Sequence, residues 1–307
     1  MRIFGILETV LPVLVVTALG YLFGRKGWIS EEAVAGMKSF VMNLTLPVVV
    51  FAAFYRTSFH GGMLLCAGSV TVVNLLGMGA GALINRLMGG KRPMLPFLTC
   101  GFEIGMLGYA LYGMLTGPGA QSNLAMMDAG QGVFIFTVYF GLLNARTGKS
   151  GKAAALDTLR SPILIALVLG ILLGATGLGR RLDAGPLGGT VEAVLTFIKT
   201  PTSCVILFVI GAQMQLSLSA VRRAAVLVAV RTAVMATLCA LCVFVVSRFV
   251  PMTRELLLAY GVLFILPASY VLPIYEKDPA EQALLSSTLS LNTLVTLLLF
   301  AVISAVA

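Results

Sequence analysis

The chain has 307 residues, of which 59% are hydrophobic and 11% are charged, and its formal net charge is +9. A soluble domain is about 25% charged, so water could not solvate this exterior and lipid must cover it. The composition therefore predicts an integral membrane protein and leaves no room for a separate soluble domain. The Lys and Arg residues lie between apolar runs, so they act as topology signals and do not indicate nucleic-acid binding.

Ten apolar stretches are long enough to cross a bilayer as helices, which takes roughly 20 residues each. In chain order they are 4–24, 34–55, 62–85, 94–116, 123–144, 161–178, 191–213, 222–247, 255–275 and 281–305. Glu8 lies inside the first stretch and no small-residue cleavage site follows, so we expect a retained helix and not a signal peptide. The fold class predicted is an all-α membrane protein with about ten spans.

The loops between the spans carry most of the basic residues. Thirteen Lys and Arg residues fall on one side and six on the other, leaving out the intramembrane Lys199 and Arg231. The richer side is expected to be cytoplasmic, which places both termini outside and requires an even number of spans. The small chain without targeting extensions predicts a multi-pass protein of the bacterial inner (plasma) membrane.

The two halves of the chain share features in the same order. PVLVVTALGYLFG in the first span matches PILIALVLGILLG in the sixth at an offset of 150, which puts Gly20 on Gly170. The second and seventh spans align at an offset of 157, which puts Phe51 on Phe208. Five spans is an odd number, so the second half must enter the membrane with opposite polarity. We therefore predict two inverted repeats, residues 1–150 and 151–307.

The fourth and ninth spans correspond in the two halves, and both carry residues that interrupt helices. The fourth contains Gly101, Gly105 and Gly108, and the ninth contains Pro267 and Pro273. Irregular backbone in lipid is tolerated only where protein or water shields it, and a helix N-terminus inside the membrane attracts anions. The paired interruptions predict a binding site. Close packing of small residues and a simple kink are the alternatives.

Ionisable residues inside the spans are costly unless they are paired or hydrated. We favour a functional role for Glu103 and Arg231, whereas for Asp128 and Lys199 a structural ion pair is an equal alternative. Polar residues also recur at corresponding places of the fifth and tenth spans. The candidate substrate- or ion-binding residues are Glu103, Gly105, Gly108, Tyr109, Asn123, Asp128, Gln131, Arg231, Pro267, Ser269, Tyr270, Ser287, Thr288 and Asn292.

Other chemistry has little support in the sequence. The five cysteines lie in apolar stretches, and Cys239 and Cys242 are expected to pack as small apolar residues. We find no metal site, no cofactor motif, no nucleotide-binding motif and no catalytic constellation. We therefore expect no enzyme activity and no ATP-driven transport. Inverted repeats are a common build of secondary transporters. We expect such a transporter to be driven by protons, by sodium or by the membrane potential.

The chain resembles the auxin efflux carrier family, the group of PIN-type carriers and bacterial malonate or malate permeases. The resemblance extends over essentially the whole chain. The segments that show the resemblance are LGYLFGRKGWISEEAV (19–34), FVMNLTLPVVVF (40–51), GMLGYA (105–110), SPILIALVLGILL (161–173), Arg231 and ILPASYVLPIYEKD (265–278).

The resemblance implies ten helices in two inverted five-helix halves, with interrupted spans four and nine crossing at the centre. It implies a scaffold of about 1–60 and 155–214, and a transport domain of about 61–150 and 215–307. It further implies elevator-like alternating access, a homodimer formed through the scaffold, and a small carboxylate as the substrate.

The chain departs from the family pattern at two places. Glu103 stands near where the fourth span of the family usually has an Asn, and no Asn lies close to Tyr270, where the ninth span usually has one. A carboxylate there repels an anion unless it is protonated or paired. We hypothesise that Glu103 carries a coupling proton, holds a sodium ion or pairs with Arg231. A same-fold carrier of a cation or another substrate, and a non-transporting membrane receptor or enzyme, are the alternatives.

Overall fold

The computed structural model describes residues 2–57, 61–117, 120–147, 161–214 and 220–307. All regular structure within these ranges is helical, and they contain no strand. The all-α prediction is therefore confirmed. The predicted boundary between the two halves, at residue 150, lies outside the described residues.

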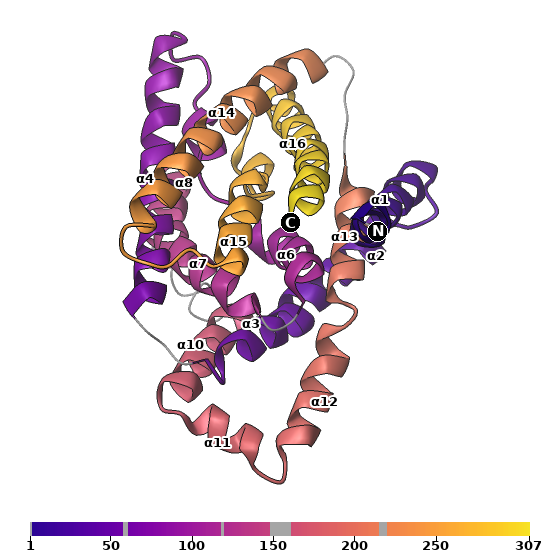
Figure 1. The fold of residues 1–307 in the computed structure, drawn as a ribbon. Coiled ribbons are helices and arrows are strands. Elements are labelled where there is room, and N and C mark those ends of the chain that lie inside the picture. Colours follow the sequence, from indigo (N-terminus) through magenta and orange to yellow (C-terminus); the bar gives the residue numbers. More distant parts are fainter. Residues whose placement is uncertain (1, 58–60, 118–119, 148–160, 215–219) are drawn as a thin grey trace.

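The helices of the first half follow the predicted spans in order (Figure 1). They are α1 (Arg2–Lys26), α2 (Glu31–Phe40), η1 (Val41–Thr45), α3 (Leu46–Phe54), α4 (Gly61–Leu87), α5 (Leu95–Leu98), η2 (Ile104–Gly108), α6 (Tyr109–Thr116), α7 (Gln121–Phe134), η4 (Ile135–Tyr139) and α8 (Phe140–Thr147). The helices of the second half are α10 (Pro162–Ala175), α11 (Leu178–Ala184), α12 (Gly188–Lys199), α13 (Thr202–Gln213), α14 (Val221–Val246), α15 (Arg254–Ile265), η5 (Leu272–Tyr275) and α16 (Pro279–Val306).

Six helical segments of the described chain are long and apolar enough to cross a membrane, or up to seven if the bent pair α10 and α11 is one span. The six are Glu31–Phe54, Gly61–Leu87, Gln121–Leu143, Gly188–Gln213, Val221–Val246 and Pro279–Val306. The predicted spans 94–116 and 255–275 are each divided by residues that are not helical. A protein that crosses the membrane several times is thus supported, and the count of ten stays a prediction.

Helix starts follow ordinary capping chemistry. Ser30 caps α2 by accepting a hydrogen bond from the Ala33 N–H at 3.2 Å, and Thr253 does the same for α15 with the Leu256 N–H at 3.2 Å. Asp278 caps α16 through the Ala280 N–H at 3.0 Å. A side-chain oxygen at this position satisfies one of the backbone donors that a helix start leaves unpaired. The polar residues between apolar runs therefore set where these helices begin.

The helices pack in two groups. The first helix group comprises α1 to α3 and α10 to α13, and in it α1 packs along α13 and α3 along α10. The second helix group comprises α4 to α8 and α14 to α16, and in it α4 packs along α7 and α14 along α16. Side-chain hydrogen bonds and ion pairs whose two partners are both described join residues of the same group. The contacts between the groups are therefore mainly apolar.

Backbones approach very closely inside the first helix group. A methyl group added at Gly20 of α1 would overlap the carbonyl oxygen of Phe208 of α13. One added at Gly170 of α10 would lie 3.1 Å from the carbonyl oxygen of Phe51 of α3. Helices in lipid associate through such packing, because lipid tails are as apolar as leucine and give no hydrophobic driving force. These glycines are therefore needed for the helix pairs of this group.

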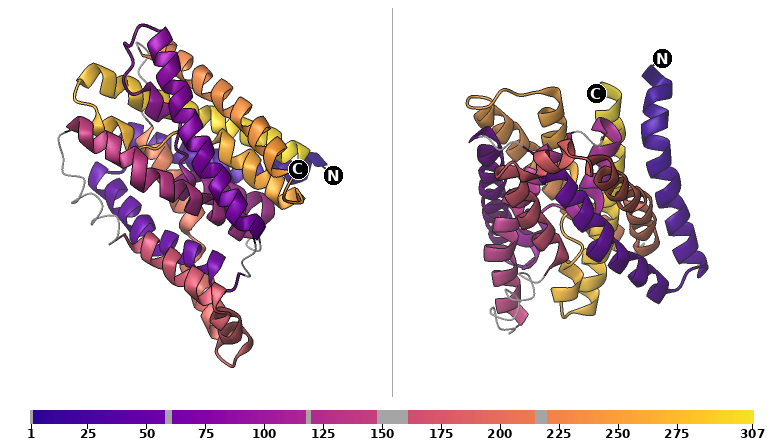
Figure 2. Two further views of the ribbon diagram at one scale, coloured as in Figure 1. Left: turned by 90° about the vertical axis from the view of Figure 1, so that its left-hand side faces the viewer. Right: turned by 90° about the horizontal axis from the view of Figure 1, so that it is seen from below.

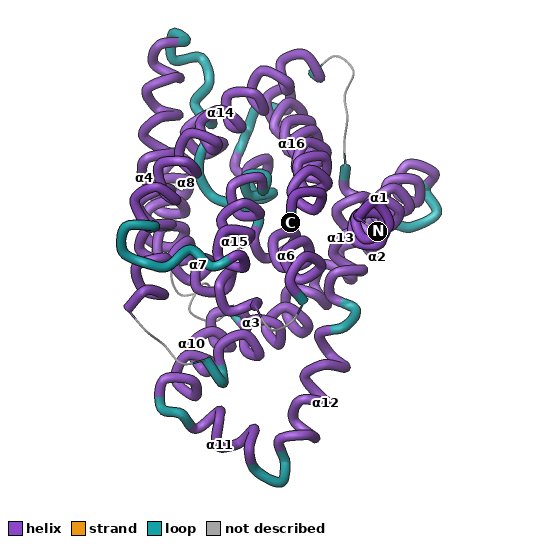
Figure 3. The backbone as a smooth tube through the Cα atoms, viewed as in Figure 1, coloured by secondary structure: helices purple, strands orange, loops and turns teal. Residues whose placement is uncertain are grey.

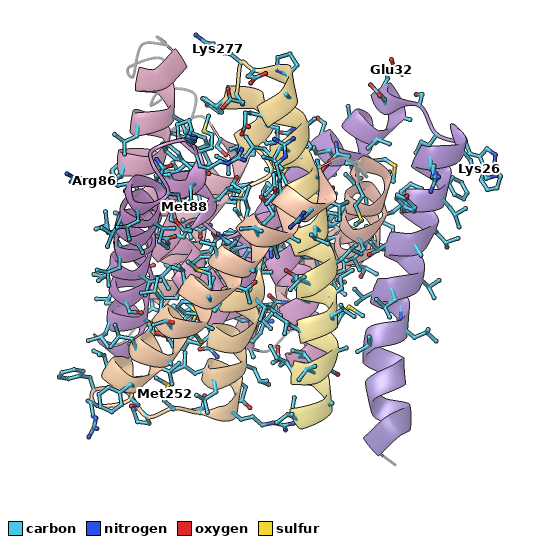
Figure 4. The ribbon with its side chains drawn as sticks, turned by 90° about the horizontal axis from the view of Figure 1, so that it is seen from above. Lys26, Glu32, Arg86, Met88, Met252 and Lys277 are labelled. Carbon is cyan, nitrogen blue, oxygen red and sulfur yellow. The ribbon has the colours of Figure 1, made fainter. Side chains whose placement is uncertain are left out.

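The chain starts and ends on one side of the molecule. Figure 2 shows that α1 begins and α16 ends at the same end. Lys26, Glu32, Arg86 and Lys277 lie toward the other end, and Met252 lies on the side of the two termini (Figure 4). This arrangement fits an even number of crossings, with the helices running between two chemically different ends.

Candidate functional site

Two non-helical stretches lie against each other inside the second helix group (Figure 3). The first stretch is Thr99–Glu103, between α5 and η2, and the second is Leu266–Val271, between α15 and η5. The Glu103 N–H donates a hydrogen bond to the Pro267 carbonyl oxygen at 3.0 Å. The Tyr270 N–H donates one to Glu103 Oε2, also at 3.0 Å. Glu103 thus joins the two stretches through both its backbone and its side chain.

The sequence gives local reasons for both interruptions. Gly101 has a φ of 66°, in the left-handed region that glycine adopts at no steric cost. Leu266 has a ψ of 147°, the extended conformation favoured before a proline, and Pro267 follows it. A methyl group at Gly108 would lie 2.9 Å from Leu266 Cδ1, so the absent side chain lets the second stretch approach η2.

Two buried amide side chains satisfy the backbone of the first stretch. Asn74 of α4 accepts a hydrogen bond from the Gly101 N–H at 2.6 Å. Gln131 of α7 pairs with Phe102 in both directions, accepting from its N–H at 2.8 Å and donating to its carbonyl oxygen at 2.7 Å. An unpaired backbone group costs several kcal/mol in a membrane interior. The two amides therefore make the interruption tolerable.

Arg231 of α14 supplies donors to carbonyl groups of both stretches. Its Nη1 donates to the carbonyl oxygens of Leu98 at 2.5 Å and Cys100 at 3.4 Å. Its Nη2 donates to the carbonyl oxygens of Gly101 at 2.8 Å and Leu266 at 2.9 Å. One guanidinium thus holds the end of α5, the first stretch and the start of the second.

Arg231 is buried, with 2% of its surface exposed, and its guanidinium lies 5.6 Å from the centre of the Phe102 ring. The ion pairs found among the described residues do not include it. The ion pair of Glu103 with Arg231, one of the options raised by the sequence, is therefore not formed in this structure. Backbone carbonyl oxygens, and not the Glu103 carboxylate, are the partners of Arg231.

A cavity of about 650 Å³ lies between the two helix groups. Its described lining residues are Gly24, Ile29, Glu31, Glu32, Val34, Ala35, Lys38, Ile210, Ala212, Gln213, Met214, Tyr270, Pro273, Ser286, Leu289, Ser290 and Thr293. The residues up to Met214 belong to the first helix group, and the others belong to the second. The volume lies within the range of small-molecule sites. Tyr270, which belongs to the second stretch, is one of the lining residues.

The predicted site residues fall into separate places. Glu103, Gln131, Arg231, Pro267 and Tyr270 gather at the two non-helical stretches, as the bonds above describe. Tyr270 also lines the cavity, where its hydroxyl lies 2.6 Å from Thr293 Oγ1. The other predicted site residues are not among those that line the cavity.

Three of the predicted residues take part in two separate contacts between α6 and α7. Asp128 accepts a hydrogen bond from the Tyr109 hydroxyl at 3.1 Å, and Asn123 donates to the Tyr112 hydroxyl at 3.4 Å. Lys199, the fourth intramembrane ionisable residue, pairs with Glu192 at 3.3 Å in the first helix group. This geometry favours a structural ion pair for Lys199 over a role in binding.

The remaining predicted residues lie on or beside the second stretch, η2 and α16. Ser287, Thr288 and Asn292 are buried on α16, and Thr288 donates to the Leu284 carbonyl oxygen of its own helix at 2.7 Å. Gly105 faces the first helix group, because a methyl group there would lie 3.3 Å from Leu46 Cδ2. Ser269 belongs to the second stretch and is partly exposed.

Sequence reasoning missed several residues of the cavity and its support. Lys38, Gln213, Ser286 and Ser290 line the cavity, and Asn74 holds the first stretch. Lys38 is the one Lys or Arg among the described lining residues, and it makes no ion pair with a described residue. The sequence analysis counted Lys38 as a topology signal, because it lies near the start of a predicted span. Its place at the cavity was missed, because no sequence pattern reveals which side of a helix faces the other group.

Known proteins are similar to this chain in sequence. Residues 5–304 match the family model described as membrane transport protein, which is the family of auxin efflux carrier-like transporters. An uncharacterized transporter of Methanothermobacter thermautotrophicus is 26% identical over 204 residues, which cover 63% of this chain and 66% of the relative. The uncharacterized transporter YfdV of Escherichia coli K12 is 26% identical over 183 residues, which cover 54% of this chain and 57% of the relative.

The matched parts thus span less than two thirds of the length of either relative. The family model, by contrast, covers nearly the whole chain, and its description and the relatives' names point to a transporter and not to an enzyme. This match confirms the resemblance that the sequence motifs indicated. The chain therefore belongs to the membrane transport protein family, that of the auxin efflux carrier-like transporters.

Proposed function

We propose that this protein is a secondary transporter of a small organic anion, a carboxylate, and that it works by elevator-like alternating access. The cavity between the two helix groups carries the proposal. It is large enough for a small solute, and it is lined by Lys38, by the hydroxyl-bearing residues Ser286, Ser290 and Thr293, and by Tyr270 of the second non-helical stretch. Irregular backbone near the middle of a membrane is typical of solute sites in secondary transporters.

Lys38 is the proposed anchor of the carboxylate. It lines the cavity from α2, and Ser286, Ser290 and Thr293 line the cavity from α16. An ammonium group and hydroxyls are donors that a carboxylate accepts from. A carboxylate bound between them touches both helix groups, so binding is coupled to their relative position.

The polar contacts support a division into scaffold and transport domains. Within the second helix group, buried hydrogen bonds tie α4, α7 and α14 to the non-helical stretches. Between the groups the closest glycine contact is Gly105 with the side chain of Leu46. Apolar side chains can slide past one another without breaking hydrogen bonds. The first group is the proposed scaffold (about 1–60 and 155–214), and the second is the proposed transport domain (about 61–150 and 215–307).

Helix packing also supports two inverted repeats of five spans. The offset of 150 carries Gly20 onto Gly170, and the offset of 157 carries Phe51 onto Phe208. In the structure Gly20 meets the carbonyl of Phe208, and Gly170 meets the carbonyl of Phe51. The same contact therefore occurs twice with the repeats exchanged, which is the relation that a pseudo-twofold axis produces.

Three finer features belong to the same proposal. Ten spans place both termini outside a bacterial inner membrane, and the scaffold forms a homodimer. Glu103 is the proposed coupling site for a proton or for sodium, because it is the carboxylate that touches the second stretch. Neither coupling mode needs a cofactor.

A carrier of a small cation is the second candidate. Glu31 and Glu32 line the cavity together with Lys38, so carboxylates outnumber cations among the described lining residues. Charge reversal separates the two: Lys38→Glu should abolish uptake of an anion, whereas a cation carrier should retain it.

The first experiment is counterflow in proteoliposomes with labelled mono- and dicarboxylates, at two pH values and with or without sodium. Lys38→Gln should raise KM by about tenfold or more, because a charged hydrogen bond contributes about 1.5–3 kcal/mol. Lys26→Gln is the matched control, since Lys26 is exposed and does not line the cavity. Failure of every carboxylate with folded protein would overturn the anion proposal.

A second variant tests the coupling site. Glu103→Gln keeps the size of the side chain and an oxygen that can accept from the Tyr270 N–H. If Glu103 carries the coupling ion, this variant loses the pH or sodium dependence of uptake. Unchanged dependence in Glu103→Gln would exclude Glu103 from coupling while leaving the substrate class untouched.

A further inference from the structure

We propose that Arg231 is a built-in cation of the two non-helical stretches. Its guanidinium offsets the partial negative charge of the carbonyl oxygens that meet there, and it keeps the two stretches in register. Arg231 is then a positioning residue and not a ligand of the transported solute, a role that neither the family match nor the relatives' names assign.

The contacts of the guanidinium carry this inference. Four carbonyl oxygens, those of Leu98, Cys100, Gly101 and Leu266, converge on its two terminal nitrogens at 2.5 to 3.4 Å. Carbonyl oxygens carry partial negative charge, and those at helix ends lack an intrahelical partner. Gathering four of them in a membrane interior is unfavourable unless a cation lies among them. In other transporters unwound carbonyls coordinate such a cation from solution.

The shape of the side chain explains why an arginine stands here. Guanidinium is planar, stays charged and presents five N–H donors in a fixed fork, so it can bond both stretches at once. Lysine has a point charge without the fork, and glutamine has two N–H donors without charge. The Phe102 ring, 5.6 Å from the guanidinium, adds a cation–π contact that also requires charge.

The same contacts argue against a role in binding solute. Arg231 is 2% exposed and is not among the residues that line the cavity. Both of its terminal nitrogens already donate to two carbonyls each. A solute in the cavity meets Tyr270 and Lys38 instead.

Chemical rescue of Arg231→Ala tests the proposal without knowledge of the substrate. The purified variant is heated in detergent with a non-denaturing, millimolar concentration of guanidinium chloride or of urea, its neutral isostere. We expect Tm to fall by roughly 10 °C, as for loss of a buried charge partner, and guanidinium but not urea to restore most of it. Arg222→Ala, at an exposed position of the same helix, should leave Tm within about 2 °C.

Two results would overturn the proposal: a Tm of Arg231→Ala equal to that of the wild type, or equal effects of urea and guanidinium. If Arg231→Ala does not fold, Arg231→Lys is compared with Arg231→Gln. A higher Tm for the lysine variant supports a cation, and an equal or higher Tm for the glutamine variant contradicts it.

Transport kinetics separate positioning from solute binding. Arg231→Lys should lower the maximal rate and change KM by no more than about twofold. A KM raised tenfold at an unchanged maximal rate would make Arg231 a solute ligand. Absence of any uptake by the wild type would count against the proposed function alone, because the rescue experiment needs no substrate.

Discussion

The two helix groups are stabilised by different means. In the first group, backbones meet at glycine, as at Gly20 and Gly170, and the ion pairs of Arg56, Glu192 and Lys199 lie in partly exposed positions. In the second group, buried polar side chains surround two stretches of irregular backbone. Continuous helices satisfy their own backbone and need only close packing, whereas interrupted helices need partners from neighbouring helices.

This difference suits a division of labour. In the first group, the hydrogen bonds and ion pairs given above between described residues stay within the group. In the second group, the hydrogen bonds given above between described residues tie its own helices together. The cavity lies at the boundary of the two.

The largest effect should come from joining the groups. Cysteines replacing Leu46 and Gly105, which face each other across the boundary, should form a disulfide under mild oxidation. Transport should then stop and should return on reduction, because the proposed elevator movement requires the two groups to slide past each other. Uptake is measured before oxidation, after oxidation and after reduction. The wild type, with its exposed Cys204, is treated in the same way as a control. Full activity of the cross-linked protein would exclude movement at this boundary.

Next in size should be the loss of a close glycine contact in either group. Gly20→Val in the first group and Gly130→Val in the second would each collide with a carbonyl oxygen, of Phe208 or of Ala67. Each should cost more than about 3 kcal/mol, because backbone atoms cannot move aside as side chains can. Gly36→Val and Gly141→Val, at glycines with open space around them, are the controls. Thermal unfolding in detergent measures both pairs, and equal Tm values within a pair would refute the packing argument.

Removing a backbone partner in the second group should have a similar or smaller effect. Gln131→Leu leaves the N–H of Phe102 without a partner, at about 1–3 kcal/mol, whereas the carbonyl of Phe102 keeps the hydrogen bond from the Ile104 N–H at 2.9 Å. Gln121→Leu on the same helix is the control, since Gln121 Oε1 has no hydrogen-bond partner in the described chain. The measurement is again thermal unfolding. A Tm for Gln131→Leu no lower than that of the control would mean that the first stretch does not depend on this amide.

The smallest effect should come from the ion pairs of the first group. Asp183→Asn weakens the contact with Arg56 Nη1, which lies 3.3 Å from Asp183 Oδ1. The two side chains are 34% and 42% exposed, so water screens the pair and the loss should stay below about 1 kcal/mol. Tm at low and high salt checks this prediction. A large loss at low salt would show that the ion pairs and not the glycines hold this group together.

Much of the fold could be predicted from the sequence because lipid imposes simple rules. Apolar runs of sufficient length become helices, and their polar ends receive caps such as Ser30, Thr253 and Asp278. Interruptions near Gly101 and Pro267 could be predicted because glycine and proline act on their own backbone. The short helix α11 was not predicted. The chain turns after α10 at Gly177, which has a left-handed conformation, and α11 begins there.

The candidate site was harder to predict, because it depends on which helix faces which. Glu103, Gln131 and Arg231 stood out in the sequence as polar residues inside apolar spans. Their partners did not, since a backbone carbonyl such as that of Leu266 has no signature in a sequence. Lys38 was predicted as a topology signal, and only its position across from α16 marks it as a cavity residue.

The sequence by itself determined that the chain is helical, lies in a membrane, belongs to its transporter family, and has polar residues near two weak points of its helices. These properties follow from composition, from residue order and from local backbone preferences. The tertiary structure decided that Arg231 bonds carbonyl groups and not Glu103, and that a cavity opens between the two helix groups. Such contacts join residues more than one hundred positions apart, and they arise from packing that no local pattern encodes.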